Sequence, residues 1–120
     1  MQGFKGLVVW QKPKDLAVRI YKRSNDGALG KDFAMGDQIR RSAVSVPSNL
    51  AEGDERDTDK ESIRFFFIAK GSLAELRIQL EIAWEVGYLS REVFHSLDDE
   101  CEALGKMIGA LIKARRAKSA

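Results

Sequence analysis

"SAVSVPSNLAEGDER", residues 42–56, combines the small polar residues of a loop with the apolar spacing of a helix. Apolar residues recur at steps of three and four through this stretch and the residues before it, so the stripe passes Pro47 in phase. Its members are Met35, Ile39, Ala43, Val46 and Leu50. The spacing predicts one helix, kinked where Pro47 removes a backbone hydrogen bond and ended by a left-handed cap at Gly53.

A second, polar stripe flanks the apolar one. It consists of Gln38, Ser42, Ser45, Asn49 and Glu52. Ser and Asn side chains bond to backbone carbonyls or to an adjoining helix, and small serines let another backbone come close. We therefore expect this polar stripe to compensate the proline and to contact a neighbouring helix.

Three further helices are predicted around this one. The first covers about residues 10–23, with Pro13 in its opening turn, and "NDGALGKD" after it reads as a loop. The third begins at the capping box Thr58–Glu61 and runs over about residues 59–86 to Gly87. The fourth starts at Ser90, and a basic tail begins at about residue 113. Together they predict one all-α domain over residues 1–120.

The third predicted helix has two apolar faces. One face suits a bundle core and carries Phe65, Phe66, Ala69, Leu73, Leu76, Leu80, Ala83 and Trp84. The other carries Ile68, Gly71, Ile78, Ile82 and Val86, which a monomeric bundle would leave exposed to water. This second face predicts a homo-oligomer interface. The alternative is a wide core face covered by the first helix.

The composition is that of a globular protein, with 44% apolar and 32% charged residues. No apolar run approaches the roughly 20 residues of a membrane span, so no membrane partner is expected. The N-terminus lacks the apolar stretch of a secretory signal, and the single Cys101 has no internal disulfide partner. We expect a cytoplasmic protein.

The charges are segregated along the chain. Residues 1–50 hold nine Lys/Arg and four Asp/Glu, residues 51–112 hold seven and fourteen, and the last eight residues hold four Lys/Arg. Segregation allows a basic surface to attract phosphates, or the basic part of one subunit to meet the acidic part of another. Ordinary solvated helix faces are the alternative interpretation.

The sequence contains no recognisable catalytic or metal-binding pattern. His95 is the only histidine and lies far along the chain from the serines, so the sequence does not indicate a serine hydrolase. We interpret His95 as a surface residue. One His and one Cys at unrelated positions offer no zinc spacing, and no phosphate-binding glycine motif is present. We expect no enzymatic activity, no cofactor and no metal.

Three segments, "VVWQKPKDLAVRIY", "QIRRSAVSVPSNLAEGDER" and "FFFIAKGSLAELRIQLEIAWEVGYL", carry a resemblance to a known family. They resemble the signature blocks of the four-helix-bundle proteins encoded in intervening sequences of bacterial 23S ribosomal RNA genes. The resemblance covers about residues 4–89. Pro13 and "GALGKDFAMGD", which lacks the usual loop proline, depart from the family pattern.

The resemblance implies an up-and-down four-helix bundle that assembles into a ring-like homopentamer. Relatives include the accessory protein of diversity-generating retroelements, a basic pentameric barrel that binds nucleic acid and a reverse transcriptase. Most members of the family have no established activity. The most repeated family motif maps onto Ser45, Pro47, Ser48, Asn49, Ala51, Glu52 and Gly53, and we interpret it as structural.

Two functions remain. In the first, an oligomer binds RNA or DNA through repeated basic patches that contact the phosphate backbone. The candidate residues are Lys12, Lys14, Arg19, Lys22, Arg23, Arg40, Arg41, Arg115 and Arg116. In the second, the oligomer is a scaffold for a protein partner, and the basic residues of the first two helices pack against "EGDERDTDKE" of a neighbouring subunit.

Overall fold

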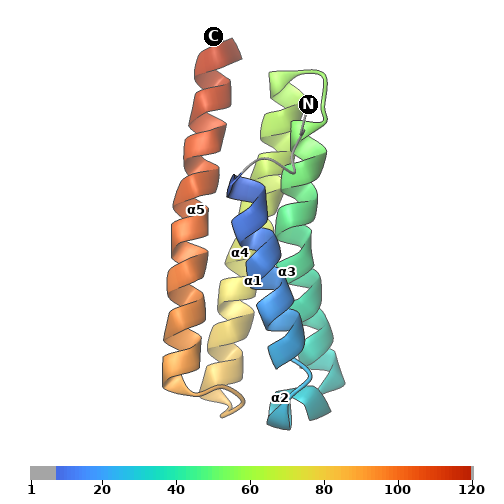
Figure 1. Ribbon diagram of the computed structural model, residues 1–120, viewed down its shortest axis with the longest axis vertical. Helices are drawn as coiled ribbons and strands as arrows, with labels where there is room; N and C mark the ends of the chain where they lie inside the picture. Colours follow the sequence, from blue (N-terminus) through green and yellow to red (C-terminus); the bar gives the residue numbers. More distant parts are fainter. Residues whose placement is uncertain (1–7, 120) are drawn as a thin grey trace.

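A computed structural model describes residues 8–119, which form five helices. Four of them are long, and α2 is short. They are α1 (Val8–Arg23), α2 (Gly27–Lys31), α3 (Phe33–Asp54), α4 (Asp59–Glu85) and α5 (Arg91–Ser119). The long helices run alternately up and down, and α1 closes the bundle by packing between α3 and α5 (Figure 1). The predicted all-α bundle of four main helices is confirmed.

The apolar stripe that passes Pro47 faces the core. Ile39, Ala43, Val46 and Leu50 are each at most 2% exposed, and α3 runs without a break from Phe33 to Asp54. Burial of this stripe offsets the hydrogen bond that Pro47 removes, because tertiary packing supplies most of a helix's stability in a folded protein.

The predicted helix starts are also confirmed. The Thr58 hydroxyl accepts a hydrogen bond from the Glu61 backbone N–H at 3.2 Å, and the Ser90 hydroxyl accepts one from Val93 N–H at 3.1 Å. Each hydroxyl satisfies a donor that the first turn of a helix leaves without a partner. At the other end of α4, Gly87 has a φ of +86°, as expected for a glycine that terminates a helix.

The predicted loop at residues 25–32 is wrong in its centre. Residues Gly27–Lys31 form α2, and Leu29 on this short helix is 3% exposed. Gly27, with a φ of +58°, turns the chain into the helix. Local composition predicted a loop, but burial of Leu29 in the core stabilises a helical turn.

Two other boundaries differ from the sequence-based prediction. Because α1 begins at Val8, Pro13 lies beyond its first turn, where it is fully buried. The predicted basic tail from about residue 113 is the last part of α5, which continues to Ser119. Basic side chains in a last helical turn interact favourably with the helix dipole, which explains the extension.

The prediction that Gly53 caps α3 is also wrong. The left-handed glycines in residues 8–119 are Gly27 and Gly87, whereas Gly53 lies inside the helix, before a cap at Glu55. Gly53 is buried, and its lack of a side chain serves packing between helices rather than chain reversal.

The second apolar face of α4 is exposed in the single subunit. Ile78 is 59% exposed and Val86 is 56% exposed, while Ile68 and Ile82 are exposed by 43% and 42%. Because α1 packs against α3 and α5, it does not cover this face. The alternative in which the first helix covers it is therefore wrong.

Candidate functional site

The family motif joins α3 to α4 through hydrogen bonds. The Asn49 side-chain amide donates to the backbone oxygen of Ser45 at 2.8 Å and to its hydroxyl at 2.9 Å. The Ser45 hydroxyl in turn lies 2.8 Å from the hydroxyl of Ser72 on α4. These bonds supply polar contacts two residues before and two residues after Pro47, in agreement with the structural interpretation of the motif.

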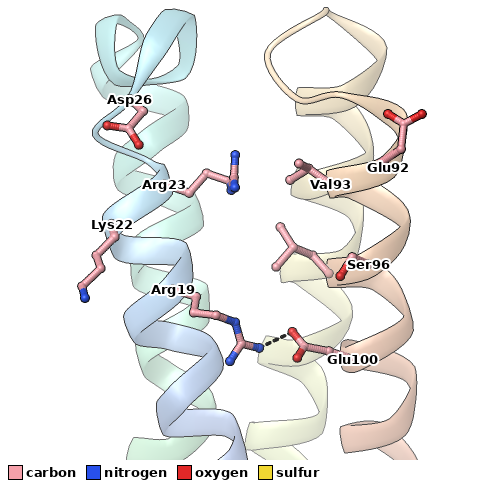
Figure 2. A pocket seen from close by; sticks show the side chains of 9 residues that line it. Arg19, Lys22, Arg23, Asp26, Glu92, Val93, Ser96 and Glu100 are labelled. Atoms are coloured by element: carbon pink, nitrogen blue, oxygen red, sulfur yellow. Dashed lines mark hydrogen bonds and ion pairs between the residues drawn. The ribbon is translucent and has the colours of Figure 1, made fainter.

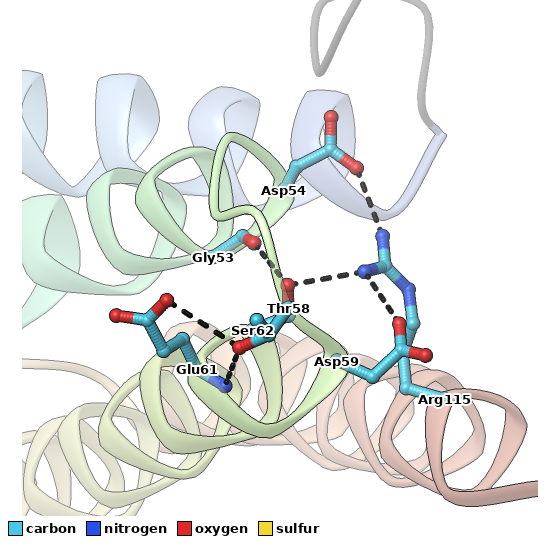
Figure 3. Close-up of polar contacts among 7 residues, drawn as sticks. All are labelled: Gly53, Asp54, Thr58, Asp59, Glu61, Ser62 and Arg115. Carbon is cyan, nitrogen blue, oxygen red and sulfur yellow. Dashed lines mark hydrogen bonds and ion pairs between the residues drawn. The ribbon is translucent and has the colours of Figure 1, made fainter. Parts of the chain in front are cut away.

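Gly53 lets the end of α3 approach α4 closely. A Cβ atom at this position would lie 2.5 Å from Cε1 of Phe66 and 3.0 Å from the backbone oxygen of Ser62. In the same contact the buried Ser62 hydroxyl donates to the Gly53 backbone oxygen at 2.6 Å (Figure 3). A side chain at residue 53 would therefore push the two helices apart.

Arg115, predicted as a nucleic-acid contact, lies in this same network. Its guanidinium donates to Asp54 at 3.2 Å and to the Ser62 hydroxyl at 3.1 Å, and it lies 3.5 Å from Asp59 (Figure 3). The Arg115 side chain is 22% exposed, and both carboxylates are about equally buried. Arg115 thus ties α5 to the turn between α3 and α4, and its charge is already paired.

Arg40 and Arg41, predicted for the same role, also interact within the chain. Arg40 donates to the buried Ser24 hydroxyl at 3.0 Å and lies 5.6 Å from the centre of the Tyr21 ring. It holds the end of α1 against α3. Arg41 is exposed and forms an ion pair with Asp37 one turn earlier.

The cations of α1 lie on two sides of that helix. Arg19, Lys22 and Arg23 border a groove between α1 and α5, opposite Glu92 and Glu100. Arg19 and Arg23 reach toward α5, and Arg19 pairs with Glu100, whereas Lys22 points away (Figure 2). Lys12 borders the continuation of this groove. Lys14 lies on the α3 side of α1 and pairs with the adjacent Asp15.

The basic end of α5 covers an aromatic side chain of α4. The Arg116 guanidinium lies 5.2 Å from the centre of the Phe67 ring. Of the predicted nucleic-acid residues, Lys12, Lys22 and Arg23 are exposed and form no ion pair with another residue in the described range.

A second exposed apolar surface, which the sequence analysis missed, lies in a groove between α1 and α3. We call it the α1/α3 groove, and its volume is about 600 Å³. It is lined by Trp10, Lys14, Ala17, Val18, Tyr21, Lys22, Val44, Pro47, Ser48 and Ala51. Val18, Tyr21 and Val44 are each at least 42% exposed. The spacing of Val44, Ser48 and Ala51 beside the core stripe was the available signal.

Chemical activity finds no support in the described part of the chain. No group of three or more His, Cys, Asp or Glu side chains within residues 8–119 is arranged to hold a metal ion. His95 is exposed, as predicted, and burial raises the pKa of the Cys101 thiol to about 12, which makes it a poor nucleophile. No described helix has the length and apolar character needed to cross a bilayer.

The geometry defines an all-α, up-and-down bundle with two exposed apolar surfaces, one on the outer side of α4 and one between α1 and α3. The family model for the 23S rRNA-intervening sequence protein matches residues 5–110, and the chain belongs to this family. The predicted family resemblance is thereby confirmed, while the relation to retroelement accessory proteins stays a prediction.

A solved structure supports the same assignment. It is that of a protein of unknown function from the S23 ribosomal protein family of Bacteroides thetaiotaomicron VPI-5482. The two chains are 29% identical, with a TM-score of 0.82, and the match covers 88% of this chain and 99% of the other. No curated protein matches the chain.

Proposed function

We propose that this protein is a non-enzymatic, self-associating helical bundle that binds RNA or DNA through cations repeated on α1 of each subunit. The observation that carries the proposal is the presence of exposed α1 cations that form no ion pair in the described range and lie outside the α1/α3 groove, Lys12 and Arg23. Arginine and lysine side chains free of internal partners can neutralise phosphates, releasing the counterions that these had condensed.

A single subunit would bind nucleic acid weakly. Asp26, Glu92 and Glu100 border the same groove as Arg19 and Arg23 and offset part of their charge. Repetition of the α1 cations in an oligomer raises the effective concentration of each further contact, so several modest patches bind where one does not. The exposed apolar face of α4 supports such an oligomer, and the family resemblance implies five subunits in a ring.

Binding is expected to follow the phosphate backbone. The exposed α1 cations are spread along one helix of a bundle, without a recognition helix that presents several base-reading side chains together. We therefore expect little sequence preference and a steep dependence on salt. RNA and DNA differ in groove shape, so a comparison of structured RNA with duplex DNA tests whether shape matters.

The experiment measures fluorescence anisotropy of a structured RNA and of a DNA duplex at low and moderate salt. A variant with Lys12→Gln and Arg23→Gln, which lie outside the α1/α3 groove, is compared with a control carrying Lys106→Gln and Lys113→Gln. We expect the α1 variant alone to lose affinity by tenfold or more and to show a shallower slope of log K against log salt, by about 0.7–0.9 per lost contact. Equal losses in both variants would overturn the proposal.

A protein-interaction scaffold is the second candidate. It is favoured by the ion pairs that Arg19, Arg41 and Arg115 form within the chain, which leave fewer charges for phosphates. An oligomer that binds neither RNA nor DNA at low salt would support this candidate.

A further inference from the structure

We infer that the outer face of α4 in one copy docks into the α1/α3 groove of a second copy. The inference rests on the self-association in the proposed function, and it names the two surfaces that meet. The docking part is here called the α4 ridge and consists of Ile78 and Ile82 on α4 and Val86 directly after its last residue, which are exposed by 59%, 42% and 56%. These three residues project from the same side of the helix at steps of four.

The two surfaces are both apolar, and within the described residues 8–119 neither is covered by another helix. Val18, Tyr21 and Val44 in the α1/α3 groove are exposed by 44%, 50% and 42%. The α1/α3 groove is lined by residues of α1 and α3 alone. In Figure 1 α4 lies behind α1. Since α4 packs on α3 and α5, the two surfaces occupy different sides of the molecule. A contact between the α4 ridge of one copy and the α1/α3 groove of the next, repeated from copy to copy, therefore covers both surfaces.

The charges around the two surfaces are complementary. Glu75, Glu81 and Glu85 lie near the α4 ridge in the sequence, are exposed, and form no ion pair with another described residue. The cations that line the α1/α3 groove are Lys14, which pairs with the adjacent Asp15, and Lys22, which has no ion pair in the described range. An acidic ridge meeting a basic groove steers association and sets the register of the contact.

The lengths of the α4 ridge and of the α1/α3 groove also agree. The α4 ridge extends over eight residue steps, or about 12 Å at about 1.5 Å per residue. The α1 side of the groove, from Trp10 to Tyr21, extends over about 16 Å by the same measure. The groove, about 600 Å³ in volume, has room for the side chains of one helix face.

Self-pairing of two α4 helices is the competing arrangement. It would cover the α4 ridge but leave Val18, Tyr21 and Val44 exposed to water. A contact between two different surfaces covers all of them and, repeated, closes into a ring or extends into a filament, whereas an identical-surface contact stops at a dimer. The second apolar surface therefore favours the heterologous contact.

The test uses two variants, each with one damaged surface. The ridge variant carries Ile78→Lys and Ile82→Lys, and the groove variant carries Val18→Lys and Val44→Lys. Lysine at both places makes the two damaged surfaces repel one another. A control carries Ala110→Lys and Ala114→Lys at exposed positions of α5. Circular dichroism and thermal unfolding establish that each variant is folded, and light scattering after size exclusion gives the mass.

We expect the wild type and the control to be oligomers and each surface variant to be a monomer of 13.4 kDa. Mixing the two variants should give a 1:1 complex of twice that mass, because each supplies the intact surface that the other lacks. A groove variant that keeps the wild-type mass would overturn the inference and favour α4 self-pairing. A monomeric wild type, or a mixture of folded variants that stays monomeric, would also overturn it.

The mixing experiment is independent of nucleic acid. An assembly that passes the mixing test but does not bind RNA or DNA would leave the docking inference intact and refute the proposed function. If the protein binds RNA in a salt-dependent way but the groove variant keeps the wild-type mass, the docking inference alone is refuted.

Discussion

Gly53 on α3 lies against Phe66 on α4 so closely that a Cβ at residue 53 would come within 2.5 Å of the Phe66 ring. Both residues are buried, and the Ser62 hydroxyl bonds to the Gly53 backbone in the same contact. The contact sets the distance between the two helices that pack most extensively in the bundle.

We expect Gly53→Ala to destabilise the fold by about 1–3 kcal/mol, because an added methyl group forces either the Phe66 ring or the backbone of α4 to move. Gly109→Ala is the matched control, since a Cβ there meets no atom within 4 Å. It should be neutral or stabilising by up to about 1 kcal/mol. Urea unfolding measures both, and a Gly53→Ala variant as stable as the control would contradict the packing role.

Asn49→Ala should also destabilise the fold. The variant loses two hydrogen bonds to Ser45 and leaves the Ser45–Ser72 contact less ordered, which corresponds to about 0.5–1.5 kcal/mol. Gln38→Ala, at an exposed position of α3 outside the motif and the α1/α3 groove, is the control. Thermal unfolding measures the stability of both variants, and Asn49→Ala should have the lower melting temperature. Equal stability of Asn49→Ala and the parent would refute the structural interpretation of the motif.

Replacement of Arg115 should affect stability more than nucleic-acid binding. Arg115→Ala removes an ion pair with Asp54 and leaves the buried Ser62 hydroxyl without one partner, with an expected loss of about 1–3 kcal/mol. Arg91→Ala, at an exposed position, removes the same charge without these contacts. If both variants have the same urea midpoint, the network in Figure 3 does not stabilise the fold.

Acid sensitivity should depend on the bond between Asp32 and Tyr88. The Asp32 carboxylate accepts hydrogen bonds from Met35 N–H at 3.0 Å and from the Tyr88 hydroxyl at 2.8 Å. These bonds hold the pKa of Asp32 below its usual value of 3.8, and the same carboxylate raises the pKa of Tyr88 above 10.0. The stabilisation by Asp32 is therefore present above pH 3.8 and decreases as pH falls through its lowered pKa.

Tyr88→Phe tests this dependence. It should lower the melting temperature at neutral pH, and the difference from the wild type should shrink as the pH falls below 3.8. The contribution of Tyr88 should also fade as the pH rises through the raised pKa of its hydroxyl. Melting curves across the pH range measure both trends. A difference that stays constant from neutral to strongly acidic pH would contradict the assigned bond.

Ile78→Lys should disrupt self-association without unfolding the subunit. Ile78 is 59% exposed, so lysine is tolerated in the monomer, but burying its charge in an interface is unfavourable. Light scattering at matched concentration should show a lower mass than for Ala110→Lys. An unchanged mass would mean that the outer face of α4 is not an interface.

Local patterns in the sequence predicted the main helices well. The apolar spacing of residues 35–50 identified the core face of α3, and the hydroxyls of Thr58 and Ser90 identified helix starts that the structure confirms. These signals depend on residues a few positions apart, whose geometry in a helix is constant. Leu29 shows the limit, since turn-forming neighbours predicted a loop where burial stabilises α2.

The candidate site was predicted less completely. The exposed face of α4 followed from its periodicity, and Lys12, Lys22 and Arg23 are exposed as the nucleic-acid hypothesis requires. The pairing of Arg115 with Asp54 could not be predicted, because 61 residues separate them in the chain. The α1/α3 groove was missed because it forms only where two helices meet.

The sequence by itself determined the helix-forming segments, their buried faces and the family of the protein, because all three depend on local spacing and residue type. Only the tertiary structure decided which residues lie beside Gly53, Arg115 and Val18. A glycine inside a helix, an arginine near a terminus and a valine on a surface are locally ordinary. Their function depends on which distant side chain or backbone lies within a few ångströms, and helix packing sets that distance.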